Sequence, residues 1–311
     1  MGTRPLILQL LSLPLFLVYS LALASSPTSA SRNVIVIGGS SGMGKAAAFE
    51  VLSHGGRVLL VSRSMEKLKN AKKELMVAIS STGEGKEDVE DLIHLASVDV
   101  TNEDQVAALA ASQMPTDDNS ASIPWNGLVI TAAGRAAHGS VESLSSGDAR
   151  DMMESKLWGA YYCAKHLGTK LDTSSEDGAA IVFCAGIINR RPGLNCAPLA
   201  MANGALEGLT RTLALELGTS TQGRIRVNCL SPGFCDTERF NHMDPTRKQQ
   251  MMENTAASLP LQKVGQPQDM GQAIYYLLTA PFCTGVILDV DGGHGIRQYA
   301  NAQKDPMRQK K

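Results

Sequence analysis

From residue 33 onwards, the sequence alternates short apolar runs with longer stretches of helical periodicity. The short runs predict strands at 33–38, 57–62, 92–98, 126–131, 179–185, 224–230 and 285–290. The stretches between them predict helices at 42–54, 65–80, 103–113, 147–170, 197–218 and 268–279. Because the strand candidates are continuously apolar, we expect a parallel sheet covered by helices on both faces. The sequence therefore predicts a single α/β domain with a doubly wound parallel sheet over 33–295.

Composition narrows the range of functions. Charged residues make up 19% of the 311 residues and hydrophobic residues 43%, which is typical of a compact chain and excludes a disordered polyelectrolyte. Lys and Arg number 29 and Asp and Glu 30, so there is no excess charge to hold a nucleic-acid backbone. The six cysteines contain no C-x-x-C pair and no Cys/His cluster with zinc spacing, so no metal site is predicted.

The N-terminal segment is separate from the predicted domain. Residues 5–24 are almost continuously apolar, Arg4 is the one charge before them, and Ala22-Leu23-Ala24 offers the small residues that a signal peptidase accepts. We expect 1–24 to be a signal peptide that directs the chain to the secretory pathway or endoplasmic reticulum. A membrane anchor and an organelle presequence remain as alternatives. Residues 25–32 then form a polar spacer, and 296–311 form a polar tail.

A glycine-rich loop follows the first predicted strand directly and leads into a helix. Gly38, Gly42 and Gly44 have the spacing G-x-x-x-G-x-G, which allows a tight turn, close approach to a pyrophosphate and close packing of helix on strand. In this strand–turn–helix context the pattern predicts a dinucleotide site in a Rossmann fold. The loop residues expected to contact the cofactor are Gly38, Ser40, Ser41, Gly42, Met43 and Gly44.

The end of the second predicted strand indicates which dinucleotide binds. An acidic residue there would bind the ribose hydroxyls of NAD, but this chain has Ser62-Arg63-Ser64. A guanidinium beside hydroxyl groups suits a 2′-phosphate. We therefore expect the cofactor to be NADP(H), with Ser62 and Arg63 at the phosphate.

Over nearly all of 33–295 the chain resembles the short-chain dehydrogenase/reductase family. The glycine loop, residues 97–101 (SVDVT), 131–134 (TAAG), 226–237 (RVNCLSPGFCDT) and 291–293 (DGG) match family motifs in the family's order. The resemblance implies a homo-oligomer with a small-molecule carbonyl or alcohol substrate. The further cofactor-binding residues that it implies are Asp99, Val100, Ala132, Ala133, Gly134, Pro232, Gly233 and Thr237.

The same resemblance implies an unusual catalytic site. The family reduces carbonyls with an Asn-Ser-Tyr-Lys tetrad, in which the Tyr donates the proton. Placed by their flanking motifs, the four positions are Lys156, Gly186, Leu199 and Asn203. Lys and Asn have thus exchanged places, while the phenol and the hydroxyl are absent. We take Lys156 and Asn203 as the catalytic candidates, expected to face one pocket.

Several other residues are candidates for the mouth of that pocket. His138 could titrate near neutral pH or lie in a surface loop, and Arg190, Arg191 and Asn195 could bind an anionic substrate or stay solvated. Residues 240–260 fall where the family has its substrate lid. Two functions remain open: an NADP(H)-dependent oxidoreductase for a carbonyl/alcohol pair with an atypical acid–base site, or a cofactor-binding sensor or scaffold without turnover.

Overall fold

The computed structural model describes residues 32–81, 89–114, 123–134 and 137–296. Backbone contacts divide the chain into Met1–Ala30 and Ser31–Lys311, and the first of these units lies outside the described residues. The predicted signal peptide or anchor at 1–24, nearly all of the spacer and the tail from residue 297 therefore lie outside them as well. Among the helices that are described, none is long and apolar enough to cross a membrane.

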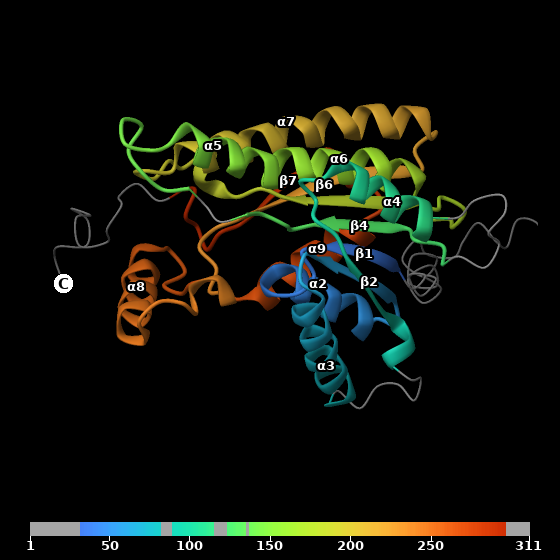
Figure 1. Ribbon diagram of the computed structural model, residues 1–311, viewed down its shortest axis with the longest axis horizontal. Coiled ribbons are helices and arrows are strands. Elements are labelled where there is room, and N and C mark those ends of the chain that lie inside the picture. Colours follow the sequence, from blue (N-terminus) through green and yellow to red (C-terminus); the bar gives the residue numbers. More distant parts are fainter. Residues whose placement is uncertain (1–31, 82–88, 115–122, 135–136, 297–311) are drawn as a thin grey trace, which may run out of the picture. The chain divides into compact units, whose positions relative to one another are not determined.

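The described strands form one parallel sheet of seven, in the order β3-β2-β1-β4-β5-β6-β7 (Figure 1). They are β1 (Asn33–Ile37), β2 (Arg57–Ser62), β3 (Ile93–Ser97), β4 (Gly127–Ile130), β5 (Ala179–Cys184), β6 (Ile225–Pro232) and β7 (Ile287–Val290). In the central register, Ile35 of β1 lies between Leu59 of β2 and Leu128 of β4. Each predicted strand is present within two residues at either end, and the predicted fold class is confirmed.

Helices cover both faces of this sheet (Figure 1). On one face lie α4 (Glu103–Gln113), α5 (Ser146–Met153), α6 (Gly159–His166) and α7 (Ala197–Ser220), and on the other α2 (Gly42–Ser53), α3 (Met65–Ser81) and α9 (Pro267–Thr279). Alternate side chains of each strand enter opposite cores. In β1, Ile35 and Ile37 belong to the first core and Val34 and Val36 to the second. Burial on both faces explains why the inner strands, such as β4 and β5, have continuously apolar sequences, whereas the edge strands β3 and β7 are only partly buried.

Two segments differ from the predicted helices. The expected helix at 147–170 is interrupted by a π turn, η4 (Glu154–Trp158), and ends in a 3₁₀ turn, η5 (Gly168–Lys170). The expected lid segment contains a helix that the periodicity did not predict, α8 (Pro245–Ser258), in which no residue is fully buried. Its start was nevertheless encoded locally, because Asp244 caps the Arg247 N–H at 3.0 Å and Pro245 follows it.

Candidate cofactor-binding and active site

The predicted site residues gather at one edge of the sheet. All seven strands are parallel, so the loops that leave their carboxyl ends meet there. Neighbouring strands β1 and β4 lead into helices on opposite faces, α2 and α5. This is the topological switch point at which doubly wound proteins bind their ligands.

Close backbone approach explains the glycines after β1. Gly38 has φ +89°, and a Cβ on it would lie 2.7 Å from Thr131 Oγ1 and 2.8 Å from the Ala132 nitrogen. A Cβ on Gly44 would lie 2.4 Å from the Gly38 carbonyl oxygen. The loop after β1 therefore packs directly on the loop after β4, and α2 starts close against the strand. A larger residue at either position would force these backbones apart.

The N-terminus of α2 binds a carboxylate of the same chain, that of Glu238. Ser41 is the N-cap residue, but its side chain makes no capping hydrogen bond. The Gly42 N–H instead donates to the carboxylate of Glu238, at 2.7 Å from Oε2. This carboxylate stands in for a phosphate oxygen, so the helix terminus fits the negatively charged part of a dinucleotide. Ser40 and Met43, the other predicted loop contacts, are both half-buried.

On the far side of β1, the end of β2 presents the predicted 2′-phosphate residues. Arg63 is exposed, and its guanidinium has no hydrogen-bonding or ionic partner among the described residues. Its backbone is fixed, because Ser97 Oγ donates to the Arg63 carbonyl at 3.1 Å. Ser62 is half-buried beside it. A fixed backbone with an unpaired guanidinium suits recognition of a phosphate.

The loop after β3 carries the predicted adenine contacts. Asp99 accepts hydrogen bonds from the backbone N–H and the hydroxyl of Thr101, at 3.0 and 2.9 Å, which makes a tight local turn. Val100 is buried against α6, where a Cβ on Gly159 would lie 2.7 Å from Val100 Cγ2. The turn therefore places Asp99 at the edge of the sheet while Val100 anchors it.

The loops after β4 and β6 complete the predicted cofactor set. Gly134, at the end of the Ala132-Ala133-Gly134 segment, donates its N–H to Ser155 Oγ at 3.0 Å. Pro232 ends β6, and a Cβ on Gly233 would lie 2.6 Å from Asp291 Cα. A Cβ on Gly42 would lie 3.4 Å from Thr237 Cβ, so the loop after β6 reaches the glycine loop. The structure thus brings all of these segments to the carboxyl ends of the parallel strands.

Lys156 and Asn203, the catalytic candidates, converge on the end of β5. Lys156 lies in the π turn and is 8% exposed, with Nζ donating to the carbonyls of Cys184 at 3.3 Å and Ala185 at 3.1 Å. Asn203, on α7, is 1% exposed and donates from Nδ2 to the Gly186 carbonyl at 3.0 Å. The two side chains therefore bind three successive carbonyls of one segment.

The surroundings of these two side chains are unusual. Burial lowers the pKa of the Lys156 ammonium, and the thiols of Cys184 and Cys229 only partly oppose this. Burial also raises the pKa of the Cys229 thiol to about 12. Asn203 Oδ1 is buried and has no hydrogen-bond partner among the described residues. An unpaired buried acceptor of this kind is costly, which indicates a position that a ligand or water would satisfy.

Of the candidates at the mouth, Arg190 is in a structural network. Its guanidinium binds Glu207 at 3.1 Å, Ser231 Oγ at 2.8 Å and both carboxylate oxygens of Asp289. Because these partners already surround its charge, the proposal that Arg190 binds an anionic substrate is not favoured. Arg191 is half-buried, and Asn195 is exposed with φ +61°.

His138 lies beside a cysteine that the sequence did not single out. Its Nδ1 is 3.5 Å from the Sγ of Cys196, the residue that precedes α7. Cys196 borders a hollow between the loop after β4 and the loop that leads into α7, lined among others by Val141, Ile188 and Leu194. This apolar hollow is the candidate substrate entrance.

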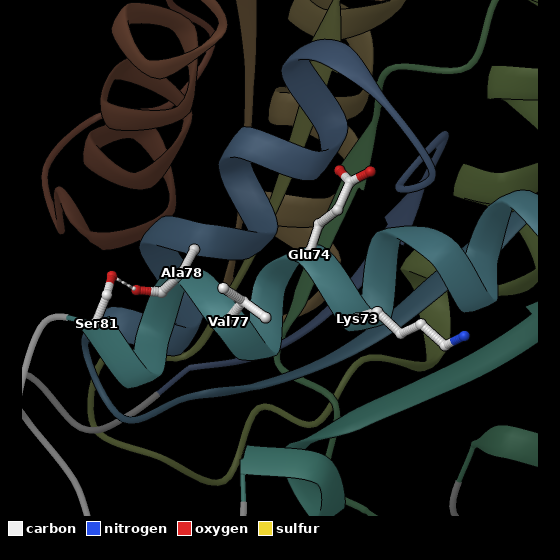
Figure 2. Close-up of a pocket in the computed structure, with 5 residues that line it drawn as sticks. All are labelled: Lys73, Glu74, Val77, Ala78 and Ser81. Atoms are coloured by element: carbon white, nitrogen blue, oxygen red, sulfur yellow. Dashed lines mark hydrogen bonds between the residues drawn. The ribbon is translucent and has the colours of Figure 1, made fainter.

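A second hollow lies on α3, away from this edge. Figure 2 shows that its five lining residues, Lys73, Glu74, Val77, Ala78 and Ser81, all come from this single helix. A surface formed by one helix is no cleft between elements, so we assign it no function. The described residues also contain no cluster of His, Cys, Asp and Glu that could hold a metal ion.

The sequence did not point to two residues that contact the predicted cofactor loops, Glu238 and Ser155. Glu238 binds both the Gly42 N–H and Lys45, whose Nζ lies 2.7 Å from Glu238 Oε1. Ser155 fixes Gly134. The one signal for Glu238 was an acidic residue directly after Thr237, a predicted cofactor contact.

The sheet order and the glycine loop at its switch point define a Rossmann-fold protein of the dehydrogenase type. The family model described as "Enoyl-(Acyl carrier protein) reductase" matches residues 38–295. The chain accordingly belongs to the short-chain dehydrogenase/reductase family of oxidoreductases, as the resemblance in its motifs predicted.

Individual relatives agree with this assignment. The chain is 28% identical over 264 residues to "Carbonyl reductase family member 4" of Danio rerio, covering 85% of this chain and 98% of the relative. It is 29% identical over 266 residues to "Uncharacterized oxidoreductase YgfF" of Escherichia coli (strain K12), covering 83% and 98%.

Solved structures are similar over the same region. A short-chain type dehydrogenase/reductase from Mycobacterium ulcerans superposes with a TM-score of 0.72 at 26% identity, covering 86% of this chain and 90% of that one. A small-chain dehydrogenase solved in complex with NADPH has a TM-score of 0.63 at 26% identity, covering 85% and 98%.

Proposed function

We propose that the protein is an NADP(H)-dependent oxidoreductase that acts on a small carbonyl/alcohol pair with an atypical acid–base site. The α2 N-terminus supports this most strongly, because it already binds a carboxylate through the Gly42 N–H at 2.7 Å. The exposed, unpaired guanidinium of Arg63 supports the choice of NADP(H). One structural neighbour is an NADPH complex, which agrees with this choice.

When bound, NADPH supplies the hydride, so the protein must supply a proton and stabilise the substrate oxygen. We assign this work to Lys156, because no phenol stands at Leu199. An ammonium has three N–H donors, and the carbonyls of Cys184 and Ala185, at and just after the end of β5, use two of them. The third is left for a substrate oxygen. The lowered pKa of Lys156 brings proton release closer to neutral pH.

Asn203 acts as a positioning residue in this proposal. Its Nδ2 holds the Gly186 carbonyl, next to the two carbonyls that Lys156 binds. The segment 184–186 is therefore fixed from both sides, and so is the ammonium that rests on it. The unpaired Oδ1 of Asn203 would accept a hydrogen bond from the bound cofactor or from water.

One observation favours the second function, a cofactor-binding sensor or scaffold without turnover. Lys156 and Asn203 both donate hydrogen bonds to backbone carbonyls directly after β5. In that case Lys156 and Asn203 replace the catalytic residues only structurally. The substrate test below separates the two functions.

The test incubates the purified full chain with NADPH and a panel of aldehydes, ketones and quinones. The loss of NADPH absorbance measures the turnover. We expect turnover with at least one compound, and a Lys156→Met variant should lose roughly 10²-fold in turnover, as removal of such an electrostatic group typically does. Binding of NADPH should change little. Lys165→Met is the matched control, because Lys165 lies on the exposed side of α6 and pairs with Glu103.

Two results would contradict the enzyme proposal. Tight binding of NADPH without oxidation by any compound would favour the sensor. Unchanged turnover in Lys156→Met would show that the exchanged lysine does no chemistry.

A further inference from the structure

The side chain of Glu238, from the same chain, binds the glycine-rich loop after β1. Glu238 belongs to the 3₁₀ turn η7 (Glu238–Phe240), which follows the predicted cofactor contact Thr237. Its Oε2 accepts the Gly42 N–H at 2.7 Å, and its Oε1 lies 2.7 Å from Lys45 Nζ. Both carboxylate oxygens are therefore bound to the first turn of α2.

This contact lies where a phosphate would bind. In doubly wound proteins the pyrophosphate of the dinucleotide sits on the first N–H groups of the helix after β1. In this chain that helix has no acidic residue in its first turn and no side-chain cap from Ser41. The carboxylate of Glu238 is thus the negative charge that satisfies the terminus.

Charge and burial make the contact strong. Lys45 is 24% exposed and is held between two carboxylates, with Glu74 Oε2 at 2.6 Å from Nζ. Burial of Glu238 by itself would raise the pKa of its carboxyl group. The hydrogen bonds from Lys45 and the Gly42 N–H outweigh this effect, so the pKa of Glu238 is lowered. The side chain therefore remains ionised at neutral pH and competes with other anions.

We propose that Glu238 is an internal competitor of the cofactor phosphates, which must leave the α2 N-terminus before the dinucleotide binds. This inference rests on the proposed function, since it takes this terminus as the phosphate site. Departure of Glu238 breaks a charge-assisted hydrogen bond and an ion pair before the phosphates replace them. The affinity for NADPH is consequently lower than the glycine loop alone would give.

The test measures NADPH affinity of the purified full chain by fluorescence titration. Glu238→Gln removes the charge at nearly constant shape, so the dissociation constant should fall about tenfold, the change that corresponds to losing one charged hydrogen bond of about 1.4 kcal/mol. A glutamine can still accept the Gly42 N–H. Glu238→Ala is therefore the second variant and should bind at least as tightly.

Glu74→Gln is the matched control. It removes a carboxylate from the same lysine without touching Gly42, so its NADPH affinity should stay close to that of the wild type. The unliganded protein gives a readout that needs no cofactor. Its thermal midpoint should fall by a few degrees in both Glu238 variants, because the helix terminus loses its counter-charge.

The outcomes separate this inference from the proposed function. If wild type and Glu238 variants bind NADPH with equal affinity, or Glu74→Gln gains as much as Glu238→Gln, the inference is wrong and the proposed function stands. If neither wild type nor variants bind NADPH or NADH, the proposed function fails and the inference fails with it.

Discussion

On folding, the ammonium of Lys156 replaces hydrogen bonds to water with hydrogen bonds to two backbone carbonyls at the end of β5. Lys156 is 8% exposed in the folded protein. Burial without a carboxylate partner favours the neutral amine, which is why its pKa is lowered. The side chain is thus held by geometry rather than by an opposite charge. Such a group has consequences for stability that can be measured apart from catalysis.

Stability should depend on pH through Lys156. Because its pKa is lower in the folded state than the ordinary 10.5, the unfolded chain binds more protons between these two values. The difference in unfolding free energy between wild type and Lys156→Met should therefore rise with pH in that window, up to about 10.5. Urea denaturation at a series of pH values measures it.

Lys165 supplies a control of opposite sign. Its hydrogen bond to Glu103 raises its pKa, so its contribution is present below pH 10.5 and is lost as the pH rises further. The difference in unfolding free energy between wild type and Lys165→Met should therefore fall as the pH rises above about 10.5. A flat or falling curve for Lys156→Met would show that Lys156 is not buried as described.

Arg63 should decide between the two dinucleotides. With an unpaired guanidinium at the end of β2, the wild type should bind NADPH at least about tenfold more tightly than NADH. Arg63→Ala should abolish that preference. Arg57→Ala removes the same charge from the other end of β2, about 20 Å away, and should preserve it. Equal affinities of the wild type for both cofactors, measured by titration, would overturn the assignment of NADP(H).

Among the elements, α9 positions α2 and with it the glycine loop. A Cβ on Gly271 of α9 would lie 2.8 Å from the backbone carbon and oxygen of Ala46 in α2. The two helices therefore touch backbone to backbone. Such close contact between elements follows from the small residues at the crossing and gives the start of α2 a fixed position.

Gly271→Ala should destabilise the protein by about 2 kcal/mol, the usual cost of forcing an extra carbon into a packed contact. Gly208→Ala is the matched control in α7, where an added Cβ meets nothing within 4 Å. It should stabilise by about 1 kcal/mol through helix propensity. Thermal denaturation of both variants checks the pair, and a stable Gly271→Ala would contradict the packing.

The elements that the sequence predicted well are those whose signal is local. The inner strands, such as β4 and β5, are apolar because both of their faces are buried, so their residues identify them without reference to other parts of the chain. The π turn at Glu154–Trp158 has no such signal, since its residues suit an α-helix equally well. For α8 the capping signal was present, but its side chains pack too little to give a strong periodicity.

At the scale of the whole molecule, contacts between residues far apart in the sequence were the hardest to predict. The order of motifs identified the family and the loops that follow the strands, and the cofactor contacts on those loops stay predictions. Glu238 could not be found in this way, because its partner Gly42 is 196 residues distant and only the folded sheet brings them together. The partners of Lys156 and Arg190 were missed for the same reason.

The N-terminal segment gives a prediction for the full chain. If 1–24 is a signal peptide, expression in a host with a secretory pathway should yield a mature chain that begins near Ser25, as determined by N-terminal sequencing. Replacing Ala22 and Ala24 with leucine should block the cleavage. Intact Met1 in a carbonate-resistant membrane pellet would instead support the anchor.

The position of β1 between β2 and β4 has a consequence for biosynthesis. Asn33, at the start of β1, hydrogen-bonds Asn126, which leaves the ribosome 93 residues later. At translation speeds of roughly 5–20 residues per second, β1 waits about 5–20 s for its neighbour β4. During that interval β1 can pair only with β2, so its other edge is exposed to chaperones and to neighbouring nascent chains.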